Sequence, residues 1–216
     1  MTNLIKTTEA EAEQVQYGFY FDSSKCTGCK TCHVSCKSRG DLPEGIIQRR
    51  VYEFVGGSFS ENADGSYSND IHTHYTSIGC NHCSEPVCVS TCPVGAMHKE
   101  EATGLVKTND EKCIGCNMCA LACPYDAPQM DTERKKMTKC DGCSDRLELG
   151  QKPICVESCP LHALDFDTME NLEAKYGKGD THLKPLPDFS VTKPNLIVKN
   201  NRHAGRGGAV INSREV

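Results

Sequence analysis

The stretch KCTGCKTCHVSCK, residues 25–37, places four cysteines at spacings of two, two and three residues. Three arrangements call for thiols at such density: a zinc site, a disulfide framework and an iron-sulfur cluster. A cubane cluster has four iron corners that each need one thiolate, and C-x2-C-x2-C supplies three of them from one loop. The fourth thiolate must then come from another part of the chain.

All the cysteines of the 216-residue chain fall into four groups of four, with none left over, and each group opens with C-x2-C and closes with C-x3-C. The segments KCTGCKTCHVSC and KCIGCNMCALAC share their Lys, their Gly and all four Cys, so one unit has been used more than once. The sixteen candidate metal ligands are Cys26, Cys29, Cys32, Cys36, Cys80, Cys83, Cys88, Cys92, Cys113, Cys116, Cys119, Cys123, Cys140, Cys143, Cys155 and Cys159.

The last two cysteines of each group stand at positions i and i+4, on one side of a short helix and one turn apart, with Cβ atoms about 5–6 Å from each other. Such a helix between two cubanes can offer one cysteine to each, as in two-cluster bacterial ferredoxins. We therefore expect four [4Fe-4S] clusters. Their predicted ligands are Cys26, Cys29, Cys32 with Cys159; Cys140, Cys143, Cys155 with Cys36; Cys80, Cys83, Cys88 with Cys123; and Cys113, Cys116, Cys119 with Cys92.

This pairing predicts an α+β fold of two bacterial-ferredoxin-like cores, one inserted in the other, with short helices and small antiparallel sheets. Helices of one or two turns are expected in EPVCVSTC, NMCALAC and KPICVESC, and strands at 18–21, 46–54, 72–78 and 104–108. The predicted divisions are an N-terminal extension at 1–15, a first core split between 16–40 and 137–176, a β-hairpin insertion at 41–76, a second core at 77–136 and an extended C-terminal arm at 177–216.

Zinc is the main alternative to iron. A zinc site made of four cysteines typically uses two separated C-x2-4-C pairs, which the group from Cys140 to Cys159 alone resembles. In the groups that begin at Cys26 and Cys113, three evenly spaced cysteines leave an orphan for a tetrahedral site. His82 lies inside CNHC, but the count of ligands closes without it. The remaining histidines, for which structural or surface roles are expected, are His33, His72, His74, His98, His162, His182 and His203.

The bulk properties exclude several classes of protein. A net charge of -5 with no basic face argues against nucleic-acid binding. No apolar run approaches the roughly 18 residues needed to span a bilayer, so no direct membrane span is expected. The N-terminus shows no export signal of its own. No Ser-His-Asp pattern, phosphate loop or G-x-G-x-x-G motif is present, so no catalytic residues are predicted. We interpret the chain as an electron-transfer protein that carries electrons between two partners.

Both ends of the chain carry less information. Residues 1–15 are acidic and lack an apolar helical face, which favours a solvated extension over a docking helix. The stretch from about residue 178 contains three prolines and a glycine-rich tail. It is interpreted either as disordered or as an arm that lies on a partner subunit.

Several segments together resemble the four-cluster iron-sulfur subunits of molybdopterin oxidoreductases, and most closely the B subunits of bacterial dimethyl sulfoxide reductases. The likeness covers residues 16 to about 200, and it departs from the pattern at Lys37, where the other groups have Pro. The segments that carry it are YGFYFDSSKCTGCKTC (17–32), SIGCNHCSEPVCVSTCPVGAMHK (77–99), CIGCNMCALACPYDAPQ (113–129) and MTKCDGCSDRLELGQKPICVESCPLHALDF (137–166).

The resemblance implies a separate catalytic subunit that holds a molybdopterin cofactor, and a donor that is either a quinol-oxidising membrane anchor or a multihaem cytochrome. It also implies cluster assembly in the cytoplasm and export with the catalytic partner to the periplasmic side of the inner membrane or beyond. The terminal substrate stays open, because nitrate, formate, tetrathionate and polysulfide enzymes share the cysteine framework. A free-standing polyferredoxin is the second hypothesis.

Overall fold

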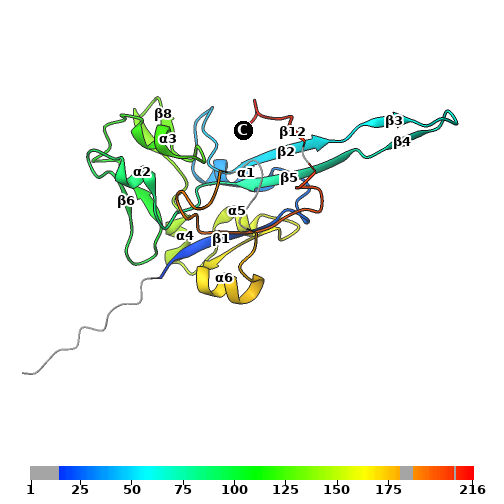
Figure 1. Ribbon diagram of the computed structural model, residues 1–216. Helices are drawn as coiled ribbons and strands as arrows, with labels where there is room; N and C mark the ends of the chain where they lie inside the picture. Colours follow the sequence, from blue (N-terminus) through cyan, green and yellow to red (C-terminus); the bar gives the residue numbers. More distant parts are fainter. Residues whose placement is uncertain (1–14, 181–186, 207) are drawn as a thin grey trace, which may run out of the picture.

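The computed structural model describes residues 15–180, 187–206 and 208–216. Short helices and small sheets alternate along the chain and form two packed bodies (Figure 1). This arrangement confirms the predicted α+β class with ferredoxin-like cores. The predicted N-terminal extension lies outside the described residues except for Val15.

The split core is built on a three-stranded sheet that joins distant parts of the chain. In this sheet β10 pairs antiparallel and β11 parallel with the central strand β1. Phe19, Phe21 and Phe166 are almost fully buried beneath it, which supplies the apolar contact that three short strands need. The elements of this core are β1 (Tyr17–Asp22), α1 (Thr31–Arg39), α4 (Ser144–Glu148), α5 (Ile154–Glu157), β10 (Leu164–Thr168), α6 (Met169–Tyr176) and β11 (Leu196–Lys199).

The inserted core contains two short helices and two hairpins, and it forms the left-hand part of the molecule in Figure 1. Its buried residues include Met97, Val106 and Met137, so methionine takes the place that phenylalanine has in the split core. The elements of this core are α2 (Val87–Ser90), β6 (Met97–Lys99), β7 (Val106–Thr108), α3 (Met118–Ala122), β8 (Gln129–Asp131) and β9 (Lys136–Thr138). Each hairpin pairs its two strands antiparallel.

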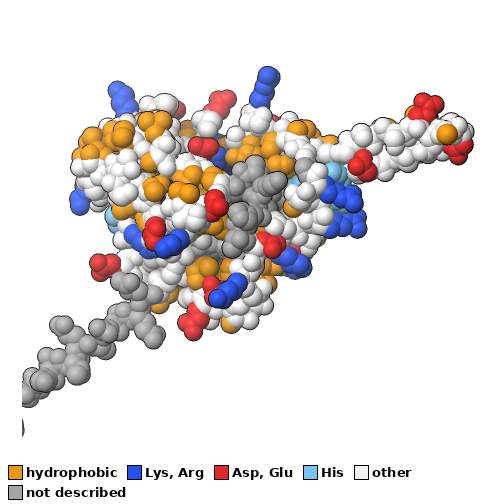
Figure 2. Space-filling view, viewed as in Figure 1, with side chains coloured by type: hydrophobic (Ala, Val, Ile, Leu, Met, Phe, Trp, Pro, Cys, Tyr) orange, Lys and Arg blue, Asp and Glu red, His pale blue; other side chains and the backbone are white. Residues whose placement is uncertain are grey.

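A long hairpin separates the two cores in sequence. Strands β2 (Arg50–Gly56) and β5 (His72–Ile78) pair over their whole length and continue into β3 (Phe59–Glu61) and β4 (Tyr67–Asn69). The outer part extends away from the rest of the molecule (Figures 1 and 2). The strand predicted at 46–54 begins only at Arg50, because the backbone of Ile47 bonds to the Gln129 side chain instead of a neighbouring strand.

The C-terminal stretch folds against its own chain, which neither sequence interpretation anticipated. Strand β11 enters the split-core sheet, and β12 (Ala209–Val210) pairs with β2. Between 187 and 199 the chain also reaches the loop of the second cysteine group, where the N–H of Ser84 donates to the carbonyl of Lys193 at 2.8 Å. The apolar side chains Leu196, Ile197 and Val198 are buried, and this burial explains why the segment is ordered on the body.

Helix α1 is longer than the helices of the other cysteine groups. A proline directly follows the last cysteine of those groups and ends the helix there, whereas Lys37 follows Cys36 and lets α1 continue to Arg39. The Lys37 ammonium then donates to the carbonyls of Pro43 and Ile46, at 2.7 and 3.1 Å. The departure at Lys37 therefore anchors the start of the hairpin insertion.

Candidate metal centres

Each cysteine group opens with a turn whose third residue has a positive φ angle. Gly28, Gly115 and Gly142 occupy this position with φ between 67° and 74°. A Cβ at Gly28 would lie 2.4 Å from the Tyr75 ring, and one at Gly115 would lie 2.5 Å from the carbonyl oxygen of Lys135. The C-x-G-C pattern thus meets a steric need as well as a conformational one, since only glycine fits such a turn without strain.

In the second cysteine group, His82 takes the place of that glycine, with φ of 43°. Its ring is fully buried, and its Nδ1 accepts a hydrogen bond from the Val106 N–H at 3.0 Å. Its carbonyl accepts from the Asn195 side chain at 2.7 Å. These bonds hold the unusual backbone conformation, so His82 has the structural role expected from the sequence.

The structure gathers the sixteen cysteines into four sets that match the predicted groupings. The Cys29 set and the Cys116 set each line a hollow of their own. The other two sets are recognised because their thiols lie close enough to interact with one another. Cys36 interacts with Cys155 and Cys143, and Cys88 interacts with Cys80, Cys123 and Cys83. The sets are the Cys29 set (Cys26, Cys29, Cys32, Cys159), the Cys140 set (Cys36, Cys140, Cys143, Cys155), the Cys80 set (Cys80, Cys83, Cys88, Cys123) and the Cys116 set (Cys92, Cys113, Cys116, Cys119).

Pairs of short helices bring distant cysteines into one set. Helix α1 packs on α5 in the split core, and α2 packs on α3 in the inserted core. The first cysteine on each helix belongs to the set of its own loop, and the next cysteine belongs to the neighbouring set. That second cysteine lies within the helix only in α1, because Cys92, Cys123 and Cys159 follow the ends of α2, α3 and α5. This is the crossed arrangement expected from the i and i+4 spacing.

Burial strongly disfavours free thiolates in most of these positions. It raises the pKa of Cys36 and of Cys88 to about 12, and that of Cys26 to about 11. After burial, the largest further cause for Cys36 and Cys88 is a neighbouring thiol of the same set, Cys155 and Cys80 respectively. Metal binding must displace these protons, so the thiol sets are suited to a cofactor that neutralises clustered negative charge.

Backbone N–H groups already point at the sulfurs. The N–H of Met97 lies 3.4 Å from Cys92 Sγ, and that of Met137 lies 3.4 Å from Cys113 Sγ. In the split core the Ala163 N–H lies 3.3 Å from Cys159 Sγ. Hydrogen bonds to sulfur are among the features that set cluster reduction potentials. The residues present therefore fit cubane clusters.

The two alternative uses of the cysteines do not fit the geometry. All sixteen cysteines are free, so no disulfide framework forms. Within the described part of the chain, no three His, Cys, Asp or Glu side chains converge closely enough to hold a single metal ion. A zinc site requires such convergence, with Zn–S distances of about 2.3 Å. Two of the sets instead line hollows between their cysteines.

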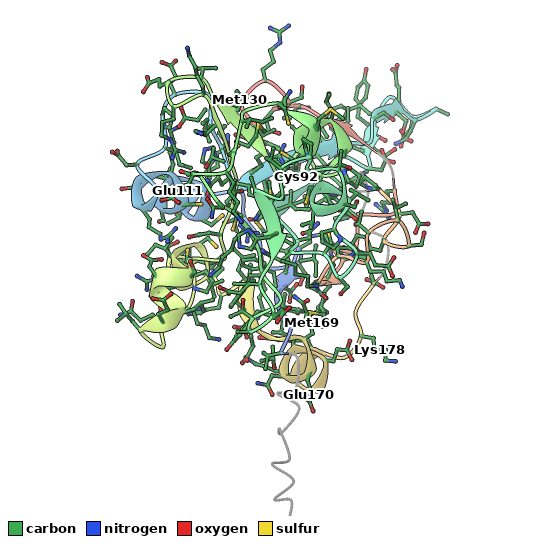
Figure 3. The ribbon with its side chains drawn as sticks, turned by 90° about the vertical axis from the view of Figure 1, so that its left-hand side faces the viewer. Cys92, Glu111, Met130, Met169, Glu170 and Lys178 are labelled. Atoms are coloured by element: carbon green, nitrogen blue, oxygen red, sulfur yellow. The ribbon has the colours of Figure 1, made fainter. Side chains whose placement is uncertain are left out.

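The four sets follow one another in a fixed order. The Cys29 and Cys140 sets are linked through α1, and the Cys80 and Cys116 sets through α2. The two cores meet where Cys140 lies near Cys80. Cys29 and Cys116, at opposite ends of this row, are the two cysteines with exposed side chains. Figure 3 shows Cys92 inside the inserted core, well away from Met169 and Glu170 on α6.

The burial of two cations beside the cysteines was not anticipated from the sequence, although Lys139 directly precedes Cys140. Arg49 is 3 % exposed and Lys139 is 6 % exposed. Lys139 donates to the carbonyls of Val106 and Cys140, the latter at 2.9 Å. The sequence IIQRRVYEF (46–54) could have indicated the Arg49 site, because it places two adjacent arginines in an otherwise strand-like segment. A buried arginine is rare without a partner, so such a residue points to a nearby negative group.

Comparison with protein families identifies the cofactor class. A family model described as "4Fe-4S dicluster domain" matches residues 71–169, and one described as "4Fe-4S binding domain" matches residues 23–40. Together these matches contain all four cysteine groups. The fold, the four thiol sets and these matches define an iron-sulfur electron-transfer protein, and its cofactors are four [4Fe-4S] clusters.

Comparison with individual proteins identifies the family. The B subunit of the anaerobic dimethyl sulfoxide reductase of Haemophilus influenzae is 53 % identical over 193 residues, which is 89 % of this chain and 93 % of that protein. The subunit of the same name from Escherichia coli K12 is 48 % identical over 93 % of this chain and 98 % of its own length. The polysulfide reductase B subunit of Wolinella succinogenes is 34 % identical over 88 % of this chain and 97 % of its own. This protein belongs to the family of dimethyl sulfoxide reductase B subunits.

Proposed function

We propose that this chain passes electrons through its four clusters from a quinol- or cytochrome-linked donor to a molybdopterin catalytic subunit that reduces dimethyl sulfoxide or a related S- or N-oxide. The observation that supports this most is the pattern of identity among relatives. The dimethyl sulfoxide reductase B subunits are 48–53 % identical to this chain, whereas the polysulfide and thiosulfate reductase subunits are 34 % and 36 % identical.

The sixteen cysteines are the proposed cluster ligands, in the four sets defined above. The clusters supply one-electron carriers, and the protein's part is to hold them in a row and control their surroundings. The proposed domain division follows the same logic. Residues 16–40 and 137–176 hold the Cys29 and Cys140 sets, and residues 77–136 hold the Cys80 and Cys116 sets.

The ends of the row are suited to exchange electrons with partners. At one end, Cys116 lies among exposed apolar side chains, of which Ile114 is 62 % and Leu121 is 77 % exposed. Figure 2 shows apolar side chains gathered on this part of the surface. At the other end, Cys29 lies beside the pocket that Leu161 lines. Exposed apolar surface next to an electron entry point favours a fixed protein partner over free diffusion.

The proposed complex consists of this chain, a molybdopterin catalytic subunit and either a membrane anchor or a multihaem cytochrome. Among the described residues, none of the helices is long and apolar enough to cross a bilayer. We infer that the subunit is peripheral, acquires its clusters in the cytoplasm and is exported together with the catalytic partner. Membrane attachment would then depend on the anchor.

Metal content tests the proposal directly. The protein should be purified anaerobically from its native host without separating its partners, and its iron, zinc and molybdenum should be measured. We expect about 16 irons per chain and close to one molybdenum. Dimethyl sulfoxide reduction by the same material, with reduced donor, would then establish the substrate class.

Two other outcomes would redirect the assignment. Iron without molybdenum, in a preparation that is stable and reducible alone, would favour the free-standing polyferredoxin. Iron with molybdenum, but turnover only of nitrate, tetrathionate, polysulfide or formate, would support the electron-transfer role and assign the chain to a different molybdopterin enzyme. Zinc in place of iron would contradict the whole proposal.

A further inference from the structure

Arg49 is a buried cation with no counter-ion among the described residues. Its side chain makes none of the ion pairs in this part of the protein, and its Nη2 is buried without a hydrogen-bond partner. Burial of an unpaired charge is strongly unfavourable, and the fold retains such a group only where something compensates it. The surroundings of the guanidinium indicate what compensates this one.

One contact and one close neighbour locate the guanidinium. Its central carbon lies 4.5 Å from the centre of the Phe19 ring, which gives a cation–π contact on one side. On another side lies Gly79, directly before Cys80, where an added Cβ would come within 3.5 Å of Arg49 Nε. The guanidinium is therefore held near the junction of the two cores.

The remaining neighbours of the guanidinium are His82 and several cysteines of the split core. Cys155, Cys32, Cys140 and Cys36 lie close enough to Arg49 to interact with its charge. Three of these four thiols belong to the Cys140 set and one to the Cys29 set. Negative charge on the Cys140 set thus provides the counter-charge that the guanidinium otherwise lacks.

The neighbouring Arg50 shows what a purely structural buried arginine does here. It is 6 % exposed, and its Nη2 donates to the carbonyls of Tyr125 and Asp126 at 2.6 and 2.8 Å. Within the described residues, Nη2 of Arg49 has no such bond. The free donor of Arg49 is available for a sulfur atom, to which a guanidinium can supply both charge and hydrogen bonds.

We propose that the Arg49 guanidinium donates to the cluster bound by the Cys140 set and raises the reduction potential of that cluster, with a smaller effect on the cluster of the Cys29 set. This inference rests on the proposed cluster ligands. Reduction adds one electron to a cluster that already carries negative charge, and a nearby cation stabilises the reduced form more than the oxidised form. Arg49 is thus a positioning and tuning residue in the middle of the wire.

Redox titration followed by electron paramagnetic resonance tests the proposal in the intact complex. We expect Arg49→Gln to shift the reduction equilibrium of one cluster about tenfold toward the oxidised form, which is about 59 mV for a one-electron couple. The iron content should stay at the wild-type value. If all four signals keep their wild-type potentials, the proposal is overturned.

Two control variants separate tuning from general effects. Arg50→Gln removes a buried guanidinium one residue away, and Arg206→Gln removes an exposed charge from the C-terminal stretch. Neither should shift the signals that Arg49→Gln shifts. Equal shifts in Arg49→Gln and Arg50→Gln would overturn the specific role of Arg49.

A conservative variant covers the case in which Arg49→Gln fails to assemble. Arg49→Lys keeps the charge but loses the planar donors, so we expect a smaller shift in the same direction. Loss of iron in both variants would assign Arg49 to folding and overturn the proposal. If only Arg49→Lys assembles and its potentials equal those of the wild type, the proposed donation by the guanidinium is wrong. If the wild-type complex itself lacks four reducible clusters, the proposed function fails before any variant is compared.

Discussion

The split core and the inserted core bind the same kind of cofactor with different amounts of supporting structure. In the split core, Cys159 joins a loop that begins at Cys26, and a three-stranded sheet with phenylalanine side chains brings them together. In the inserted core, the Cys80 and Cys116 sets come from one continuous stretch of 44 residues, Cys80–Cys123, and two small hairpins suffice.

The difference follows from chain entropy. Closing a short loop around a cofactor costs little, so local cysteines and local hairpins can form a site without a large core. Ligands from opposite ends of a chain need apolar burial to hold them together before metal arrives. The inserted core therefore depends mainly on its clusters, and the split core depends on packing as well.

The largest expected effect is from Phe166→Ala in the split core. Phe166 is 2 % exposed, and its ring lies 4.8 Å from that of Phe19 and 5.4 Å from that of Tyr17. Truncation of a buried Phe costs about 3–5 kcal/mol. We expect iron in the anaerobically purified complex to fall toward half, because the Cys29 and Cys140 sets lose their support while the inserted core keeps its clusters.

The matched control for Phe166→Ala is Met137→Ala in the inserted core. Met137 is also 2 % exposed, and its loss costs about 2–5 kcal/mol. This variant should lose iron from the Cys116 set and keep the split-core signals. If either variant loses all iron in one step, the two cores form a single cooperative unit and the contrast between them is wrong.

The next largest effect is expected from Cys116→Ser. Cys116 is an exposed member of the outermost set, so its replacement should convert or destroy one cluster and leave the other three in place. Iron should fall by about one to four atoms per chain. Unchanged iron content and an unchanged spectrum of the reduced protein would show that Cys116 is not a ligand.

A moderate, pH-dependent effect is expected from Asp165→Asn in the split core. Although burial raises the pKa of Asp165, hydrogen bonds from Lys152, Lys175 and Tyr176 outweigh it and hold the pKa well below its ordinary value. Hydrogen bonds to a charged group contribute about 2 kcal/mol here. The lowered pKa stabilises the fold above the unfolded value near 4, and this stability is lost as the pH falls below it.

Thermal unfolding of wild type and Asp165→Asn at several pH values measures this contribution. The difference between the two proteins should stay constant from about pH 8 to pH 5 and shrink only below about pH 4. A difference that changes between pH 6 and pH 8 would mean that another group controls the stability of this sheet edge.

The smallest effect is expected from Arg39→Gln. Arg39 donates to both oxygens of Asp141 at 3.2 Å and also pairs with Asp145, and so joins the two sequence halves of the split core. The pairs are partly exposed to solvent, so their loss should cost less than about 1 kcal/mol. Thermal unfolding in low and high salt should show the loss disappearing at high salt. A larger, salt-independent loss would place this contact among the determinants of the core.

The cysteine spacing determined most of the site. The closely spaced cysteines predict ligands, turns and short helices locally. With only two residues between successive cysteines, the backbone has few ways to surround a cubane. The pairing across i and i+4 rested on helix geometry together with the analogy to two-cluster bacterial ferredoxins. The glycines of the opening turns could be anticipated in the same way, and His82 could be separated from the ligands by counting.

The parts that sequence reasoning missed depend on contacts between distant residues. Strand β11 was not expected because LIVK is short and follows several prolines, and only its burial against β1 stabilises it. The burial of Arg49 and Lys139 was missed for the same reason, since basic residues are normally exposed. Arg49 directly precedes β2 and Lys139 directly follows β9. The sequence by itself determined which atoms can hold the clusters, because ligand spacing is a local property of the chain. Only the tertiary structure decided which cations and strands surround those atoms, because long-range packing sets that environment.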